Sequence, residues 1–286
     1  MELRLSLSSN SDAFINYLKN FAKMRSSLLL EIDIKKSMFV AKTVSEDRSS
    51  VRYSAIDFDT CNISVSPDAD FEISDRIKLG ILNQLPKLIK MCERFGSDLD
   101  GTDQTSFSIN IVYDKVLNPD NTFNYVSSGV GFASKALSMK FDGFKLTEFR
   151  YMTDDVFFNT VFSVSDAICF ELSPELIDNT IKTSDIIKRN PKEDLLVISV
   201  KDSQVFVHDV TKQSLSNFNY NLCCLSEKSD VELSVPIRRD TFIRMFSKTE
   251  ETFKVLLGKS VKGVLDRVVF DSLNSPTKIV ISAVSE

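Results

Sequence analysis

The segment SDAFINYLKNFAK, residues 11–23, has the pattern from which the fold of the chain can be worked out. Its apolar side chains recur every three or four residues, as they do on one face of a helix: Phe14, Leu18, Phe21 and Ala22. Ser11 is a preferred helix cap, and the opposite face is polar, with its positive charge at Lys19 and Lys23. The segment therefore predicts an amphipathic helix with a basic outer face.

The elements around this helix form a series that occurs twice. In the first series the helix is preceded by a strand and followed by short apolar runs, a second basic helix predicted from Gln84 to Phe95, and more strands. The second series opens its helix with Ser173-Pro174-Glu175, a cap followed by proline at the first helical position, and this helix runs to about Asn190. Its short helix is predicted from Ile237 to Lys248. The repeated order favours a duplicated α+β fold with antiparallel sheets.

Short apolar runs separated by Ser, Asp and Lys clusters predict the strands of both series. In the first series they are Glu2 to Leu7, Leu28 to Ile34, Met38 to Thr43, Val51 to Phe58, Ile63 to Val65, Ile77 to Ile81, Phe107 to Tyr113, Phe123 to Val126 and Ala133 to Phe141. In the second they are Ala167 to Leu172, Leu195 to Val200, Gln204 to Val210, Phe218 to Leu225, Val231 to Val235, Phe253 to Leu257, Leu265 to Phe270 and Lys278 to Val284. The strands between Leu28 and Ile81 are expected to form an antiparallel meander. We predict two similar domains, 1–145 and 167–286, joined by an aromatic and acidic connector at 146–166 that crosses the outside of the sheet.

The charge of the chain is unevenly distributed. Its formal net charge is -5, yet the predicted helices carry more Lys and Arg than Asp and Glu. In an acidic protein, positive charge gathered on helices favours contact with phosphate backbones, without any reading of bases. The alternative is that these charges only solvate the outer faces of amphipathic helices.

Residues that often form metal or redox sites lack the required spacing here. The five cysteines are scattered without any C-x-x-C pair, and Cys223-Cys224 places successive side chains on opposite faces of a strand. The one histidine, His208, lies in an alternating strand, where a structural role is favoured over a general base. These features predict neither a zinc site nor a disulfide framework, and they favour a reducing cytoplasm.

Other catalytic and targeting patterns are also missing from the sequence. Gly129-Val130-Gly131 lacks the third glycine and the helix of a nucleotide-binding loop. The acidic pairs Asp98/Asp100 and Asp154/Asp155 could bind a metal, but without supporting ligands we interpret them as solvated loop residues. The first residues alternate like a strand, so we expect no signal peptide, and no apolar run is long enough for a transmembrane helix. We therefore expect no cofactor, no metal and no membrane association.

Four short stretches match motifs of one protein family. They are Tyr17-Leu18-Lys19-Asn20-Phe21-Ala22 in the first helix, Ser74-Asp75-Arg76 and Leu79-Gly80-Ile81-Leu82 before the second, and Phe253-Lys254-Val255-Leu256-Leu257 after the fourth. Together with the order of elements over nearly the whole chain, these stretches resemble the DNA sliding clamps, of the two-domain type found in T-even bacteriophages and in proliferating cell nuclear antigen. The chain is longer than the phage clamps, chiefly at residues 96–105 and 146–167.

The resemblance implies a ring of three subunits joined head to tail around double-stranded DNA, with the basic helices lining the hole and the sheets outside. It implies sequence-independent contacts to DNA phosphates by Lys19, Lys23, Lys87, Lys90, Arg94, Lys182, Lys188, Arg189, Arg244 and Lys248. Ring closure would pair the strand Ala133 to Phe141 of one subunit with Phe218 to Leu225 of the next; the alternative is that both are edges protected within a monomer.

The resemblance also implies partners that dock short peptides in a hydrophobic pocket beside the connector. These are the replicative DNA polymerase and other replication proteins, while a clamp loader would open the ring. The residues expected to line the pocket are Val44, Val51, Phe157, Phe158 and Val284. Taken alone, each of them is better explained by ordinary core packing. The implied function is that of a non-enzymatic processivity factor of a bacteriophage or similar virus.

Two other functions remain open on the sequence. A monomeric or dimeric viral processivity factor with the same fold would hold DNA by charge alone, and its binding to linear DNA would depend strongly on salt. A β-rich virion structural protein would use the acidic surface and the edge strands for assembly and would not retain DNA. A nuclease would need metal-dependent activity that is lost on changing Asp154 or Asp155.

Overall fold

The computed structural model describes residues 2–7, 12–67, 77–81, 84–97, 107–117, 123–133, 138–142, 153–185, 194–209, 219–225, 232–260 and 266–284 of the 286-residue chain. The chain forms two compact units. Unit 1 contains Met1–Thr43 and Ser54–Tyr151, and unit 2 contains Val44–Tyr53 and Met152–Glu286. The tip of an N-terminal hairpin thus belongs to unit 2. The domain boundaries expected from the sequence, at 145 and 167, stay a prediction.

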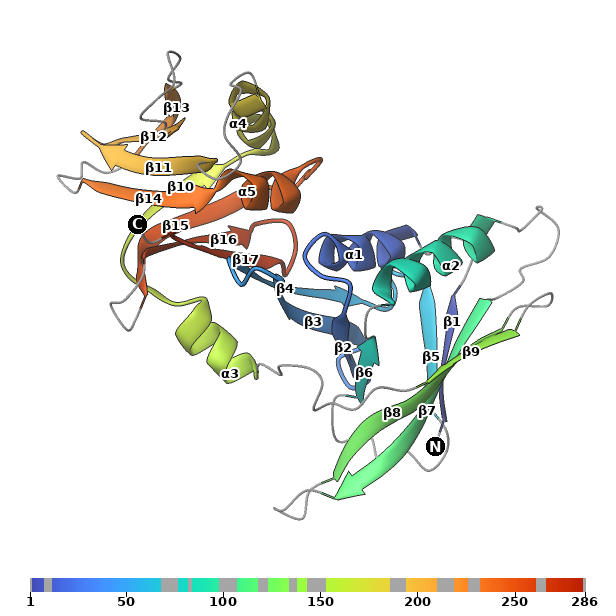
Figure 1. Cartoon of the computed structure of the whole chain (residues 1–286). Coiled ribbons are helices and arrows are strands. Elements are labelled where there is room, and N and C mark those ends of the chain that lie inside the picture. Colours follow the sequence, from blue (N-terminus) through green and yellow to red (C-terminus); the bar gives the residue numbers. More distant parts are fainter. Residues whose placement is uncertain are drawn as a thin grey trace. The chain divides into compact units, whose positions relative to one another are not determined.

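Unit 1 is built on a mostly antiparallel sheet with helices packed against it (Figure 1). Its elements are β1 (Glu2–Leu7), α1 (Asp12–Ala22), β2 (Leu28–Asp33), β3 (Met38–Val44), β4 (Ser50–Asp57), β5 (Ile63–Pro67), β6 (Ile77–Ile81), α2 (Leu85–Ser97), β7 (Phe107–Leu117), β8 (Phe123–Ala133) and β9 (Ser138–Asp142). The strand order is β4-β3-β2-β6-β8-β7-β1-β5, with β9 paired to β8. Among the strand pairs described here, β6 and β8 run parallel and the others antiparallel.

The core of unit 1 lies between the sheet and the pair of helices α1 and α2, which lie side by side in Figure 1. Phe14, Leu18 and Phe21 of α1 are completely or almost completely buried, as their helical spacing predicted. The ring of Phe14 packs 4.9 Å from that of Phe39 on β3. Because each such side chain contributes about 1.5–3 kcal/mol of burial free energy, this apolar stripe fixes which face of α1 points outward.

Unit 2 contains two sheets. Its elements are α3 (Asp154–Val156), a π-helical turn (Phe157–Val161), β10 (Val164–Leu172), α4 (Pro174–Asp185), β11 (Leu195–Lys201), β12 (Gln204–Asp209), β13 (Asn219–Cys224), β14 (Leu233–Arg238), α5 (Arg239–Phe246), β15 (Phe253–Ser260), β16 (Asp266–Ser272) and β17 (Lys278–Ser282). One sheet has the order β10-β15-β16-β17 and is extended by the first half of β4, because Ser50 to Tyr53 pair with β17. The other has the order β13-β12-β11-β14.

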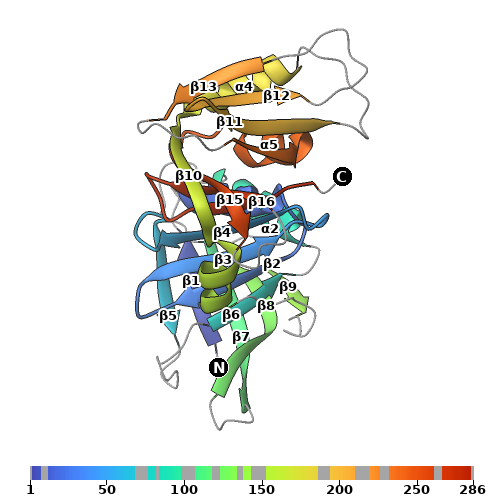
Figure 2. The ribbon, with the colours of Figure 1, turned by 90° about the vertical axis from the view of Figure 1, so that its left-hand side faces the viewer.

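The helices of unit 2 are positioned by packing and by caps. Phe242 and Phe246 of α5 are buried against Phe253 and Phe270, with ring centroids 4.6 Å apart for Phe246 and Phe270. Ser173 caps α4 through a bond from the amide of Leu176 to its Oγ, as predicted from Ser173-Pro174-Glu175. Figure 2 shows β10 as a long strand, and it follows the helical turn that is labelled α3 in Figure 1.

Several predicted elements differ from the structure. The run from Leu28 to Ile81 is not a simple meander, because β5 pairs with β1 and β6 returns to pair with β2. The predicted strand at Phe123 to Val126 continues to Ala133, through Gly129 and Gly131. The second long helix is described only to Asp185, and the remaining predicted residues to Asn190 lie outside the described residues.

Candidate nucleic-acid interface

Helices α1 and α2 present lysines on their solvent side. Lys19 and Lys23, at the end of α1, and Lys87 and Lys90 of α2 are all exposed. Lys19 Nζ lies 2.8 Å from a carboxylate oxygen of Glu93 on α2, which links the two helices and reduces their local positive charge by one. The side chain of Arg94, the remaining predicted site residue of α2, is outside the described residues. The structure therefore brings four of the predicted lysines together on one helical pair.

Helix α4, as described from Pro174 to Asp185, is net negative, because Glu175, Asp178 and Asp185 outnumber its single cation, Lys182. The Lys182 side chain is 70% exposed and pairs with Asp178 one turn earlier at 2.5 Å. Such an exposed pair contributes little stability, so Lys182 can exchange its carboxylate for a phosphate at small cost. Lys188 and Arg189 lie outside the described residues.

Arg239, the first residue of α5, joins this helix to the end of α4. Its Nε donates to Ser184 Oγ at 3.0 Å, and its Nη atoms bind Asp194 and Asp185. The guanidinium is mostly buried, so Arg239 is a structural residue that sets the separation of the two helices. Arg239 was not among the residues predicted to face DNA, and the sequence carries no sign of its contacts with α4.

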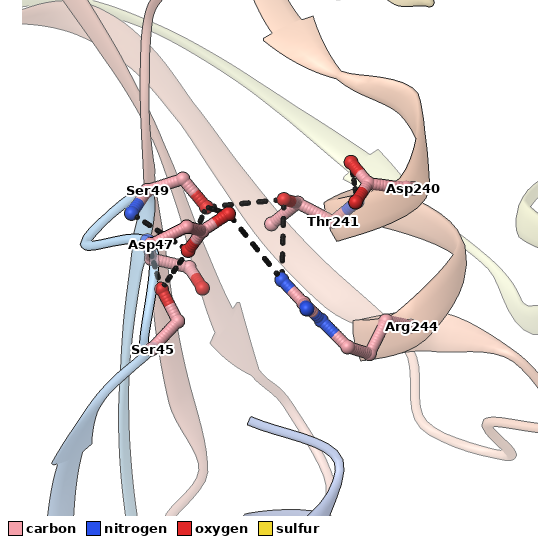
Figure 3. Close-up of polar contacts among 7 residues, drawn as sticks. Ser45, Asp47, Ser49, Asp240, Thr241 and Arg244 are labelled. Carbon is pink, nitrogen blue, oxygen red and sulfur yellow. Dashed lines mark hydrogen bonds and ion pairs between the residues drawn. The ribbon is translucent and has the colours of Figure 1, made fainter. Parts of the chain in front are cut away.

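Arg244, in the last turn of α5, is engaged in a polar cluster with the tip of the β3–β4 hairpin (Figure 3). Its Nη2 lies 3.7 Å from Asp47 Oδ2 and 3.4 Å from Thr241 Oγ1. Thr241 Oγ1 is also 3.0 Å from Ser49 Oγ, so the hairpin tip and α5 are joined by two contacts. The Arg244 side chain is 33% exposed, less than the lysines of α1 and α2. Lys248, just after α5, is exposed and has a φ of 61°.

Asp47 is held as a carboxylate in this cluster. Burial favours its neutral form, but hydrogen bonds from the Ser45 hydroxyl, the Ser49 amide and the Ser49 hydroxyl, together with the charge of Arg244, lower its pKa below the usual value. Sequence analysis missed Asp47, Ser49 and Thr241, because a polar turn such as SEDRSS carries no sign of a distant partner.

The two strands expected to close a ring lie at sheet edges. In the part of the chain that the structure describes, β9 pairs with β8 and with no other strand, and β13 pairs with β12 and with no other strand. Each therefore has one side whose backbone N–H and C=O groups can accept a further strand.

Solved structures match the chain over its whole length, whereas no family model and no curated protein matches it. A. fulgidus PCNA with the bound C-terminal region of FEN-1 has a TM-score of 0.60 and 10% identity, covering 99% of this chain and 100% of that one. The Helicobacter pylori β clamp bound to a DNA ligase peptide has a TM-score of 0.61 and 13% identity, covering 99% and 67%. The Pseudomonas aeruginosa DnaN sliding clamp bound to griselimycin has a TM-score of 0.64 and 10% identity, covering 100% and 66%.

The chain has the DNA sliding-clamp fold. The fold predicted from the sequence is thereby confirmed, with antiparallel sheets and few helices. The match is complete on both sides for the archaeal clamp, while the chain spans 66–67% of the length of these two bacterial clamps.

The residues expected to line a peptide pocket of this clamp fold all fall in unit 2. Phe157 and Phe158 pack against Tyr53, with ring centroids 5.3 and 5.2 Å away. Val51 lies two residues before Tyr53 on β4 and so projects from the same face of the strand. Phe157 is completely buried, whereas Phe158 and Val51 are half-buried.

No described contact joins the other two predicted pocket residues, Val44 and Val284, to this aromatic cluster. Val44 is half-buried at the end of β3, where the hairpin turns. Val284 is half-buried, and its amide donates to the Pro236 carbonyl on β14 at 2.8 Å. Among the described residues, Phe157 and Phe158 therefore share one aromatic cluster with Tyr53, and their role in partner binding stays a prediction.

Groups that could support catalysis are few in the described part of the clamp fold. No group of three or more His, Cys, Asp or Glu residues there could hold a metal ion. Asp155 accepts a bond from the Asn159 side chain, and His208 Nδ1 lies 3.3 Å from the Asp209 carbonyl. Asp98 and Asp100 lie outside the described residues. No described helix is long and apolar enough to cross a membrane.

Proposed function

We propose that the chain is a DNA polymerase processivity factor, a non-enzymatic sliding clamp that encircles double-stranded DNA and tethers the replicative polymerase. The observation that carries this proposal is the exposed lysine face of α1 and α2 on a clamp fold. Such lysines make sequence-independent contacts to phosphates, which are weak enough for sliding. Arg94, Lys182, Lys188, Arg189, Arg244 and Lys248 complete the proposed DNA-facing set.

The proposed ring is a homotrimer closed head to tail between β9 of one subunit and β13 of the next. Among the described residues, β9 and β13 each pair with a single strand, which supports this arrangement, because a closed ring pairs strand edges between subunits. A clamp loader would open it, and we propose a bacteriophage or similar virus as its source and the host cytoplasm as its location.

The proposed pocket for polymerase peptides contains Val44, Val51, Phe157, Phe158 and Val284. The archaeal and Helicobacter clamps that resemble this chain were solved with peptides of FEN-1 and of DNA ligase, which supports peptide docking as the mode of partner binding. Phe158, half-buried and in contact with Tyr53, is the residue through which we expect a peptide to bind.

Subunit number is tested by light scattering across a dilution series. A mass of about three times 32.3 kDa supports the closed ring. A monomer at all concentrations excludes it and favours the processivity factor that holds DNA by charge alone. Larger particles that do not retain DNA favour the virion structural protein.

The lysine face is tested with the double variant Lys87→Glu/Lys90→Glu. We expect it to lose most of the retention of the protein on circular duplex DNA, since two phosphate contacts become repulsive. The matched control is Lys35→Glu/Lys36→Glu, two exposed lysines in the β2–β3 turn of the same unit. Equal loss in both variants would mean that total charge, and not the α1–α2 face, controls DNA binding.

A further inference from the structure

Asp47 is the acidic group nearest to Arg244 among the described residues, and it comes from the hairpin tip and not from α5 (Figure 3). The side chains of Asp47 and Arg244 are 28% and 33% exposed, so the pair is open to water and to ligands. Their separation of 3.7 Å is longer than a good charge-assisted hydrogen bond, which is 2.7–2.9 Å. Asp47 thus neutralises Arg244 without holding it tightly.

The guanidinium has capacity for another anion. Its described contacts all run through Nη2, to Asp47 and Thr241, so Nη1 takes part in none of them, while Nε is buried and out of reach of a ligand. An arginine has five N–H donors in a planar fork that matches a phosphate. Arg244 can therefore offer one Nη group to a phosphate while Asp47 is in place, and both Nη groups once Asp47 is displaced.

The hairpin tip does not depend on this ion pair for its position. Ser49 Oγ and Thr241 Oγ1 are 3.0 Å apart, and the turn itself is closed by bonds from Ser45 and Ser49 to Asp47 Oδ1. The atom that faces Arg244 is the other oxygen, Oδ2. Oδ1 accepts the bonds from the Ser45 hydroxyl and the Ser49 amide, while the Ser49 hydroxyl lies 2.8 Å from Oδ1 and 2.9 Å from Oδ2. The turn therefore keeps its bonds to Oδ1 when Oδ2 loses its charge.

We propose that Asp47 competes with the DNA backbone for Arg244, so that the hairpin tip weakens one phosphate contact of the clamp. This inference rests on the proposed function, because it assumes that α5 faces DNA. Its consequence is a lower affinity and a weaker salt dependence than the lysines and arginines alone would produce, which suits a protein that must move along DNA.

The test is the variant Asp47→Asn. Asparagine keeps an acceptor oxygen at Oδ1 for the bonds from the Ser45 hydroxyl, the Ser49 amide and the Ser49 hydroxyl. It replaces the charged Oδ2 by a neutral amide, so it removes the ion pair and, within the turn, only the second contact of the Ser49 hydroxyl. Binding to a short linear duplex, measured by fluorescence anisotropy at several salt concentrations, should tighten about three- to tenfold. The slope of log affinity against log salt should steepen by about 0.9, the value for one phosphate.

Two controls separate this mechanism from a change in total charge. Asp240→Asn removes the same charge from the first turn of α5, where Asp240 is exposed and contacts the Thr241 amide but not Arg244. It should change binding much less than Asp47→Asn. In an Arg244→Gln background, Asp47→Asn should have no effect on affinity, because the group it releases is gone.

Three results would overturn the inference: Asp47→Asn binds no tighter than wild type, it binds more weakly, or its effect persists in Arg244→Gln. Failure of the proposed function itself looks different. In that case the wild-type protein and the Lys87→Glu/Lys90→Glu variant bind the duplex equally poorly, whatever residue stands at position 47.

Discussion

Lys42 and Glu31 face each other inside the sheet of unit 1, with nitrogen and oxygen 2.8 Å apart and both side chains only 2% exposed. Removing one partner of such a pair leaves a buried charge without its counter-charge, which costs about 3–5 kcal/mol. We therefore expect Lys42→Met to lower the unfolding free energy of the protein by about that amount, measured by urea denaturation.

The double variant Glu31→Leu/Lys42→Met tests the reason for this loss. Because both charges are then absent, it should recover most of the stability, as apolar replacements of buried pairs often do. A double variant no more stable than Lys42→Met would show that the pair is needed for packing and not only for its charge balance.

Asp57 provides a test in pH. The Thr60 amide and hydroxyl donate to its two carboxylate oxygens at 2.7 and 2.8 Å, and these bonds lower its pKa below the usual value of 3.8. A lowered pKa in the folded state means that the carboxylate stabilises the fold above the unfolded pKa and loses this effect as pH falls through the folded value. Thermal melts between pH 5 and pH 2 should therefore show a shallower loss of stability in Asp57→Asn than in wild type.

The candidate site contains one part that the sequence predicts, the lysines of α1 and α2, and one part that it does not, the contact between Asp47 and Arg244. The lysines of α1 and α2 were predicted, because helical spacing alone decides which face is buried and which is exposed. The cluster around Arg244 was not, since its Ser49–Thr241 contact joins residues 192 positions apart. Only the folded arrangement of the hairpin and α5 creates it.

Strand β8 is an element whose length the sequence predicted too short. The predicted strand ended at about Val126, yet it continues through Gly129 and Gly131 and pairs with β7 on one side and β9 on the other. Glycine has weak strand propensity, but pairing on both sides supplies the hydrogen bonds that overcome it. The helix α1, by contrast, was predicted nearly to its ends because its own apolar periodicity determines it.

Gly258 in β15 carries a prediction about the packing of β10 on β15. A Cβ at this position would lie 2.6 Å from the backbone carbonyl oxygen of Ser165, beside the bulge between Ser165 and Ile168. Gly258→Ala must shift backbone, so we expect it to lower the unfolding free energy by about 1–3 kcal/mol. Lys259→Ala, at the exposed neighbouring position, is the control and should stay within about 0.5 kcal/mol of wild type.

For the whole molecule, a closed ring makes a prediction that charge alone does not. A ring is retained by topology, so after loading it should stay on nicked circular DNA through a high-salt wash and leave as soon as the circle is cut. Gel filtration of the loaded DNA before and after cutting measures this. Equal release from the circle and from linear DNA would contradict encirclement and favour a protein that binds by charge.

At the scale of the whole molecule, the sequence did not indicate that residues 44–53 belong to unit 2. The strand pattern places residues 44–53 inside the first series, since they read as an ordinary hairpin. Their pairing with β17 assigns them to unit 2, and no local propensity encodes a partner strand so far along the chain.

The assignment of residues 44–53 to unit 2 affects how the chain folds during its synthesis. During synthesis the hairpin tip emerges early, but β17 and α5, which its backbone and side chains contact, are translated near the other end of the chain. Until β17 has been synthesised, the first half of β4 has an unpaired strand edge, and such an edge can pair wrongly with neighbouring nascent chains. A fragment that starts at residue 152 would lack the fifth strand of its sheet, which β4 supplies. Unit 2 is therefore compact in space but is not encoded by one continuous segment of the sequence.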